Sequence, residues 1–258
     1  MNAGCGLVPE QILCTAGAYM KVLQASGLIR IYRGFLTGIV LVILIVLILA
    51  AMWVVEFLHA SRVFMSHLQA ALVLIGGVLM LCNLAVLNGL NETEHASDSL
   101  RRSKYGFLGL ILFRLSDILL DSSRILYYSR AGQSLPHSTL LSYPLPFLLI
   151  YISCWLLINY YAQRNLICGL TDVWRDCGGG SDTAEQMRKL RAVLDAAIAV
   201  VLPASIALVL LIRYRISVLF SLLLPVLLAA IGTFWFCVQF RLAAYAKKTA
   251  ALVDSAAR

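Results

Sequence analysis

An uninterrupted apolar run from Phe35 to Val55 constrains the fold of this chain more than any other feature. The run carries no charged residue, and about 20 apolar residues suffice for a helix to cross the hydrocarbon core of a bilayer. Hydrophobic residues make up 61% of the 258 positions and charged residues 13%, about half the usual share in a soluble domain. This composition excludes a water-soluble enzyme, a disordered chain and a collagen-like chain, and it predicts an integral membrane protein.

Further apolar segments follow the first, so the sequence predicts an all-α, polytopic membrane helix bundle with about six transmembrane helices. The expected spans are residues 35–55, 70–87, 105–128, 144–161, 192–212 and 216–240. The other expected parts are an N-terminal amphipathic flank at 1–34, a cytosolic loop at 163–190 within the 35–240 bundle, and a basic helical tail at 241–258. Gly76 and Gly77 in the second span allow a close approach of two helices there.

The distribution of basic residues predicts that both termini are cytosolic. Six spans place both termini on one side of the membrane, and the positive-inside rule assigns the more basic side to the cytosol. The segments on the side of the termini carry Lys21, Arg30, Arg33, Arg101, Arg102, Lys104, Arg164, Arg175, Arg188, Lys189, Arg191, Arg241, Lys247, Lys248 and Arg258, whereas the opposite segments carry Arg62, Arg124, Arg130, Arg213 and Arg215. Asn91 begins an N-glycosylation sequon, but its loop lies on the predicted cytosolic side, so we expect it to be unmodified.

The net charge of +8 has a membrane explanation. Basic residues between apolar runs set topology and contact anionic lipid head groups. The expected partners are therefore the lipid bilayer, these head groups and either further copies of the chain or other membrane proteins, and nucleic acid is not among them. The seven cysteines include no CxxC pair, and the four histidines fall near or between the spans, so the sequence predicts no metal site, disulfide framework or haem. No P-loop, Rossmann, HExxH or GxSxG motif occurs, and we expect no cofactor, no catalytic residue and no enzymatic activity.

Four charged residues form a stripe on the third expected span. At 100° per residue, Arg114, Asp117, Asp121 and Arg124 fall within roughly an 80° arc of one helix face. Ionisable residues inside a membrane are costly and usually face a bundle interior or a watery cavity. Three interpretations stay open: a self-neutralising seam in which each arginine pairs with the nearer aspartate, a helix that lies in the membrane interface, and an ion or proton path.

Three more polar residues lie within the expected spans. Asp195 is near the start of the fifth span, and we expect it to pair with Arg191 or Arg188 in a capping or snorkelling role rather than a catalytic one. Asn83 and Asn159 are expected to form hydrogen bonds between helices.

Several short motifs occur in the same order as in a known family. They are Lys21-Val-Leu-Gln24 followed by Arg30, then Ser61-Arg62-Val-Phe64 with His67-Leu-Gln-Ala-Ala71, then Leu190 to Pro203 with Asp195 before an apolar run. Together they resemble the peroxisomal-division peroxins (the peroxin-eleven family). The resemblance implies cytosolic termini and a role in peroxisome biogenesis or division. The N-terminal half of that family is amphipathic, whereas residues 35–55 here form a plain spanning run, so the family's membrane-remodelling helix is not assigned to this chain.

A second segment, Thr233-Phe-Trp-Phe-Cys-Val-Gln-Phe240, is similar to the final-helix motif of insect gustatory receptors. Its spacing is one residue short, and the chain has one predicted span fewer than that family. The leading hypothesis is therefore a multi-pass protein that organises or remodels an organelle membrane (peroxisome-type biogenesis or division) by helix packing and oligomerisation. The alternatives are a channel or transporter that uses the charged stripe, and an accessory membrane subunit of a larger complex.

Overall fold

A computed structural model describes residues 24–44, 47–48, 51, 62–130, 144–214 and 218–257. Almost all of these residues are helical, as the periodicity predicts. The first described helix is Gln24–Leu44, called helix 24–44 below. It is followed by α2 (Arg62–Thr93), a short 3₁₀ helix η1 (Glu94–Ala96), α3 (Asp98–Arg130), α4 (Leu145–Asp176), α5 (Ser181–Tyr214) and α6 (Val218–Ser255). The predicted all-α class is confirmed.

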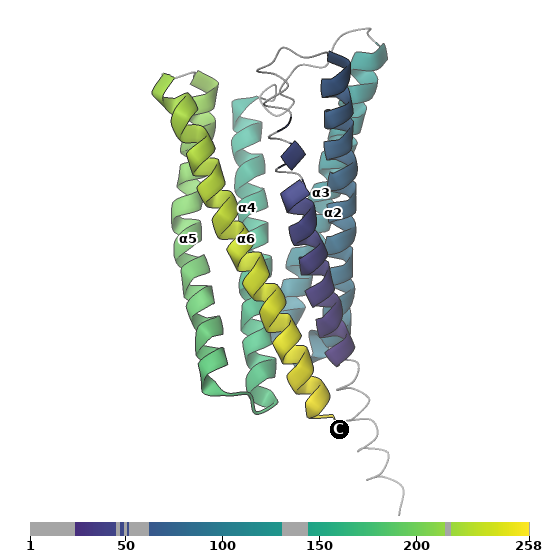
Figure 1. The fold of residues 1–258 in the computed structure, drawn as a ribbon, viewed down its shortest axis with the longest axis vertical. Helices are drawn as coiled ribbons and strands as arrows, with labels where there is room; N and C mark the ends of the chain where they lie inside the picture. The colour runs from purple at the N-terminus through teal and green to yellow at the C-terminus, as the bar shows by residue number, and fades with distance from the viewer. Residues whose placement is uncertain are drawn as a thin grey trace, which may run out of the picture.

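The helices lie side by side with their long axes roughly aligned (Figure 1). The α2–α3 and α4–α5 connections, the start of helix 24–44 and the C-terminus all lie at the lower end of the bundle in this view. α3 packs between α2 and α4, and α4 also contacts α5 and α6. The segments that the sequence assigns to the cytosol are therefore brought to one end of the molecule.

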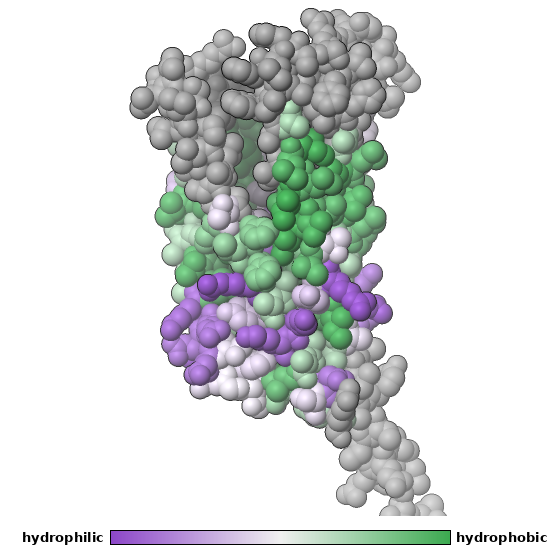
Figure 2. Space-filling view, in the orientation of Figure 1, coloured by the Kyte–Doolittle hydropathy of each residue, from purple (hydrophilic) through white to green (hydrophobic). Residues whose placement is uncertain are grey.

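The face of the bundle seen in Figure 2 divides into an apolar band and a polar end. Large apolar side chains point outward from several helices: Leu74 is 72% exposed, Ile150 64% and Val200 68%. Outward apolar residues on several helices are typical of a helix bundle in lipid. α4 has 32 residues and is about 48 Å long, whereas the hydrocarbon core is about 30 Å thick, so its polar end extends beyond the lipid.

Four helices among the described residues are long and apolar enough to cross a membrane: Gln24–Leu44, Leu74–Ala96, Leu145–Asp176 and Ser181–Ala207. They match the first, second, fourth and fifth expected spans, with different ends. The third and sixth expected spans lie in α3 and α6, which are long helices but are not among these four. The chain is thus a multi-pass membrane protein with four candidate spans, and residues 45–46 and 49–50 and the end of the first expected span at 52–55 lie outside the described residues.

The segment 163–190, expected to be a cytosolic loop, is helical except at 177–180. α4 continues to Asp176 and α5 begins at Ser181, because the residues here include good helix formers such as Gln, Met, Arg and Lys. Gly178 adopts a positive φ of 75°, and the amide of Gly179 donates to the carbonyl of Trp174 at 2.8 Å, which closes the end of α4. The flank at 1–34 likewise joins the first span, since helix 24–44 passes through residue 34 without a break.

Polar contacts tie the helices together at the polar end. The carboxylate of Glu92 accepts a hydrogen bond from the hydroxyl of Ser26 at 2.9 Å and pairs with Arg30 at 2.5 Å, which joins α2 to helix 24–44. The hydroxyl of Ser97 donates to the carboxylate of Asp172 at 2.7 Å and joins the α2–α3 connection to α4.

Small residues let the helices approach one another within the bundle. A Cβ built on Gly106 of α3 would lie 2.7 Å from the Cα of Ala162 on α4, and one on Gly89 would lie 2.5 Å from the carbonyl oxygen of Gly27. The close approach that Gly76 and Gly77 allow is not used by the described atoms, since a Cβ on either glycine meets none of them within 4 Å. Adjacent glycines permit close packing, but the arrangement of the helices decides whether a neighbour uses the space.

The C-terminus and the 177–180 turn should lie on the same, cytosolic side of the membrane, because the end of the bundle that holds both carries the basic clusters. Epitope tags placed at the two sites should both be digested by protease in sealed microsomes, whose cytosolic face is outward, and Asn91 should remain without glycan. Protection of only one tag would contradict the placement of both sites on one side of the membrane. Protection of both tags would show that the bundle has the opposite orientation.

Candidate functional site

A cavity of about 280 Å³ lies between helix 24–44, α2, α3, α4 and α6. Most of its wall is apolar and includes Phe35, Ile39, Leu79, Phe107 and Leu110. Five polar side chains also face it, one from α2 (Asn83), one from α3 (Arg114), two from α4 (Asn159 and Gln163) and one from α6 (Gln239). An apolar wall with a few convergent polar groups is typical of a ligand site, and cavities between the helices of a bundle are a common place for one.

The α4 wall of the cavity follows from helical spacing. Trp155, Asn159 and Gln163 recur every four residues and therefore lie on one face of α4 over about 12 Å. The side chain of Asn159 is buried, and its amide nitrogen donates to the carbonyl of Trp155 at 3.1 Å, so its described hydrogen bond stays within α4. The interhelical hydrogen bond expected for Asn159 does not appear among the described contacts, which leaves its side-chain oxygen as an acceptor at the cavity wall.

Gln163 has the most unusual environment in the cavity wall. Its side chain is 1% exposed, and among the described residues its oxygen Oε1 is buried without a hydrogen-bond partner. A buried acceptor left unpaired costs about 1–3 kcal/mol. A donor that reached this oxygen from the cavity would remove this penalty, so the glutamine favours an occupant with an N–H or O–H group.

Arg114 lies at the other end of the cavity. Gly106, eight residues earlier, packs against Ala162 next to Gln163, so Arg114 is about 12 Å farther along the bundle from the polar end. The ring of its neighbour Phe113 lies 4.5 Å from the ring of Tyr151 on α4. The cavity therefore has an acceptor at one end and a cation at the other.

The remaining members of the stripe, Asp117, Asp121 and Arg124, have side chains outside the described part of the structure. Their backbone belongs to α3, as expected. The pairing of Arg114 with Asp117 stays a prediction. Small polar residues of the same helix satisfy themselves locally: the hydroxyl of Ser116 donates to the carbonyl of Leu112 at 3.0 Å.

Two tryptophans separate the cavity from a second hollow. The rings of Trp155 and Trp235 lie 6.4 Å apart at an angle of 38°, and both line the main cavity. The same pair also lines an apolar hollow of about 180 Å³ that α4, α5 and α6 enclose. Aromatic faces at this position offer a stacking surface to a flat apolar ligand.

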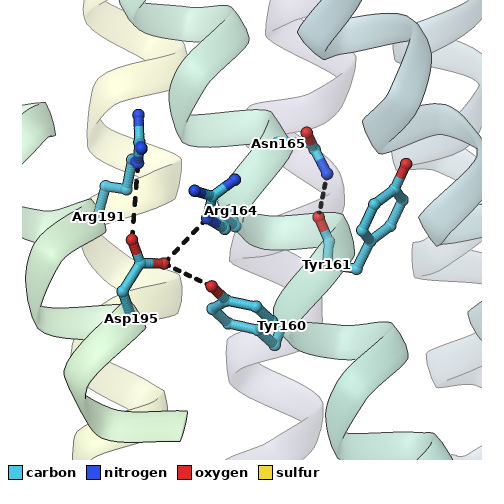
Figure 3. Close-up of polar contacts among 6 residues, drawn as sticks. All are labelled: Tyr160, Tyr161, Arg164, Asn165, Arg191 and Asp195. Atoms are coloured by element: carbon cyan, nitrogen blue, oxygen red, sulfur yellow. Dashed lines mark hydrogen bonds and ion pairs between the residues drawn. The ribbon is translucent and has the colours of Figure 1, made fainter. Parts of the chain in front are cut away.

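A second polar group, the boundary cluster of Tyr160, Arg164, Arg191 and Asp195, joins α4 to α5 near the polar end (Figure 3). The hydroxyl of Tyr160 donates to Asp195 Oδ1 at 2.7 Å, and Arg164 Nε approaches the same oxygen at 3.0 Å. Arg191 Nε lies 3.7 Å from Oδ2. The predicted pair of Asp195 with Arg191 is confirmed, whereas Tyr160 and Arg164 come from α4 and were not anticipated.

The boundary cluster has a structural role. Its carboxylate accepts hydrogen bonds from a tyrosine and an arginine of the neighbouring helix, so Asp195 holds α4 and α5 in register. Both Asp195 and Arg164 are 34% exposed at their side chains, which places them at the edge of the apolar band rather than in its interior. This position fits the capping or snorkelling role expected for Asp195.

The fold brings together three residues that the sequence singled out separately: Asn83, Arg114 and Asn159 all line the main cavity. Sequence reasoning missed Gln163 and Gln239. The spacing of four between Asn159 and Gln163 was the available signal, because it places both amides on one helix face. Gln163 went unnoticed because it fell in the segment expected to be a loop.

The described residues place no three His, Cys, Asp or Glu side chains close enough to hold a metal ion. The groups that the cavity offers are amides, one guanidinium and aromatic faces, whose chemistry is hydrogen bonding, charge pairing and stacking. Comparison with protein-family models, with curated proteins and with solved structures finds no match to the chain.

Proposed function

We propose that this multi-pass membrane protein binds a small amphipathic molecule in the cavity between its helices and acts as a carrier or receptor for it. The unpartnered Oε1 of Gln163 carries this proposal, because a buried acceptor on the wall of a cavity calls for a donor inside it. The proposal develops the transport alternative of the sequence, with Arg114 as the part of the charged stripe that meets the occupant.

The size and lining of the cavity define the ligand class. Its volume of 280 Å³ is about twice that of a ~150 Å³ apolar cavity that admits benzene, so a two-ring molecule fits. Trp155 and Trp235 favour a flat aromatic body. Gln163 selects a donor at one end, and Arg114 selects a negative charge at the other. The expected ligand is an aromatic acid with an N–H or O–H group away from its carboxylate.

Three probes separate these contributions. Indole-3-carboxylate has both the donor and the charge, naphthalene-2-carboxylate lacks the donor, and indole lacks the charge. Equilibrium dialysis against the protein in nanodiscs, corrected for empty nanodiscs, should show the tightest binding for indole-3-carboxylate. Gln163→Leu should weaken that probe about tenfold, since one hydrogen bond is worth roughly 1.4 kcal/mol, and should leave naphthalene-2-carboxylate unchanged.

Two further variants sharpen the test. Arg114→Leu should weaken both acids and spare indole, whereas Gln186→Leu, which replaces an exposed glutamine outside the cavity, should change none of the three. The Gln163→Leu protein should fold at least as well as the wild type, because it removes a buried unpaired acceptor. No binding above empty nanodiscs, or an equal loss for both acids in Gln163→Leu, would overturn the proposal.

The peroxin resemblance supports a second proposal, organisation or remodelling of an organelle membrane through helix packing and self-association. The broad apolar outer surface, with Leu74 and Val200 strongly exposed, supplies area for contacts between copies in the membrane. Fluorescent-tag localisation of the full-length chain tests it: the proposal expects peroxisomal membranes and a change in organelle number on overproduction. Localisation elsewhere with no change in organelle shape would exclude it.

A further inference from the structure

A second, basic hollow lies between α5 and α6, outside the cavity described above. It has a volume of about 420 Å³. Its lining comprises Gln186 and Lys189 from α5 and Phe240, Arg241, Ala244, Tyr245 and Lys248 from α6. Arg241, Tyr245 and Lys248 are spaced by four and three residues, so they share one face of α6. Three cations thus surround one space, and no acidic residue is part of its lining.

Acidic side chains of the described residues neutralise little of the positive charge of this basic hollow. Lys189 pairs with Glu185 at 2.8 Å, but the side chains are 73% and 55% exposed, and such surface pairs contribute little. No acidic side chain of the described chain forms an ion pair with Arg241 or Lys248. Lys247, the neighbour of Lys248, is turned away from the hollow and lies 5.5 Å from the centre of the Tyr32 ring.

The basic hollow lies where the apolar band meets the polar end. Phe240 precedes Arg241 directly and is 56% exposed, and Val193, one turn beyond Lys189 on α5, is 50% exposed. Apolar side chains beside a group of cations match a lipid, whose acyl chains and head group occupy the two sides of this boundary. Basic pockets between membrane helices on the cytosolic side are a recognised form of lipid site.

We propose that the basic hollow binds the phosphate monoester head group of an anionic lipid. A monoester carries about −1.5 to −2 charges, which suits three cations better than the single negative charge of a diester. Arg241 contributes a planar fork that holds two phosphate oxygens, and the two lysines act as point charges. The phenol of Tyr245 adds a neutral donor. Burial raises the pKa of Tyr245 above its ordinary value.

The experiment measures lipid retained by the full-length protein. Nanodiscs of phosphatidylcholine would contain phosphatidic acid, phosphatidylinositol 4-phosphate or phosphatidylserine as the minor component, and native mass spectrometry after extraction would count the bound lipids. Both monoester lipids should be retained, and phosphatidylserine, which has a diester phosphate, should be retained at least tenfold less. Addition of inorganic phosphate or inositol 1,4-bisphosphate should not displace them, because neither supplies acyl chains.

The chain offers a matched control. Arg241→Gln and Lys248→Gln should each lower retention of phosphatidic acid about tenfold, whereas Lys247→Gln, with the same change in net charge one position away, should retain it fully. All three side chains are exposed, so the variants should fold, and an unchanged melting temperature verifies this. An equal loss of retained phosphatidic acid in Lys247→Gln would mean that the lipid is held by diffuse charge attraction, and it would overturn the proposal of a specific site in the basic hollow. Displacement by inorganic phosphate would reassign it to soluble phosphate, and equal retention of phosphatidylserine would overturn the preference for a monoester.

Discussion

Replacing Gly106 by leucine should separate α3 from α4 and abolish stable assembly of the bundle. A Cβ at this position would lie 2.7 Å from both Cα and Cβ of Ala162 and 3.0 Å from its amide nitrogen, so the obstruction is mainly backbone, which cannot rotate away. The hydroxyl of Ser103, one turn earlier, donates to the carbonyl of Ala162 at 2.8 Å and would be pulled from its acceptor. Overpacking alone costs about 1–3 kcal/mol, and loss of this buried hydrogen bond adds to it.

The measurement is the monodisperse fraction in size-exclusion chromatography, together with the melting temperature in detergent. Gly77→Leu is the control, since a Cβ there meets nothing within 4 Å and leucine improves helix propensity. Gly77→Leu should match or exceed the stability of the wild type. Equal damage from both changes would show that leucine is harmful for reasons other than the α3–α4 contact.

Removing the carboxylate of Asp195 should have the second largest effect on stability. Asp195→Leu leaves Arg164 without its ion-pair partner and Tyr160 without its acceptor at the α4–α5 contact. The expected loss is about 1–3 kcal/mol, in the lower part of that range because the carboxylate and Arg164 are each 34% exposed and water can replace part of the interaction. The double variant Asp195→Leu with Arg164→Leu should recover much of this loss, because the charge of Arg164 is removed together with its partner, and Arg191, whose side chain is 43% exposed, is left to water.

Thermal melting of the wild type, the two single variants and the double variant gives the coupling between the residues. Glu185→Leu breaks an exposed pair of similar length, Lys189 with Glu185, and should change stability by no more than about 0.5 kcal/mol. Strictly additive losses for Asp195 and Arg164 would contradict an energetic link between α4 and α5 at this position.

Hydropathy predicted the membrane-spanning helices better than their ends. The apolar run at 35–55 overlaps the candidate span Gln24–Leu44, yet this helix begins before the run, and α4 continues to Asp176, well past its apolar segment. A helix ends where its backbone hydrogen bonds end, and lipid contact does not set that point. The same distinction explains why 163–190 was expected to be a loop.

The candidate site was predictable only in parts. Asn83, Arg114 and Asn159 stand out because polar residues are rare in apolar segments, but their common cavity depends on how α2, α3 and α4 pack. Gln163 stands in a polar stretch, where only its spacing of four residues from Asn159 distinguishes it from a solvated residue. The close contact at Gly106 was missed for the same reason: whether a glycine faces a neighbour or lipid is a property of the packed bundle.

The contact between Gly106 and Ala162 also forms a pivot point about which α3 can tilt relative to α4. α3 begins at Asp98, about 12 Å to the polar side of this contact, and Arg114 lies about 12 Å to the other side. A helix is stiff over such a distance, so a tilt of α3 about this pivot point moves the segments on its two sides by similar amounts in opposite directions. An outward tilt of the α3 segment at the polar end would therefore move Arg114 inward, toward the cavity that it lines.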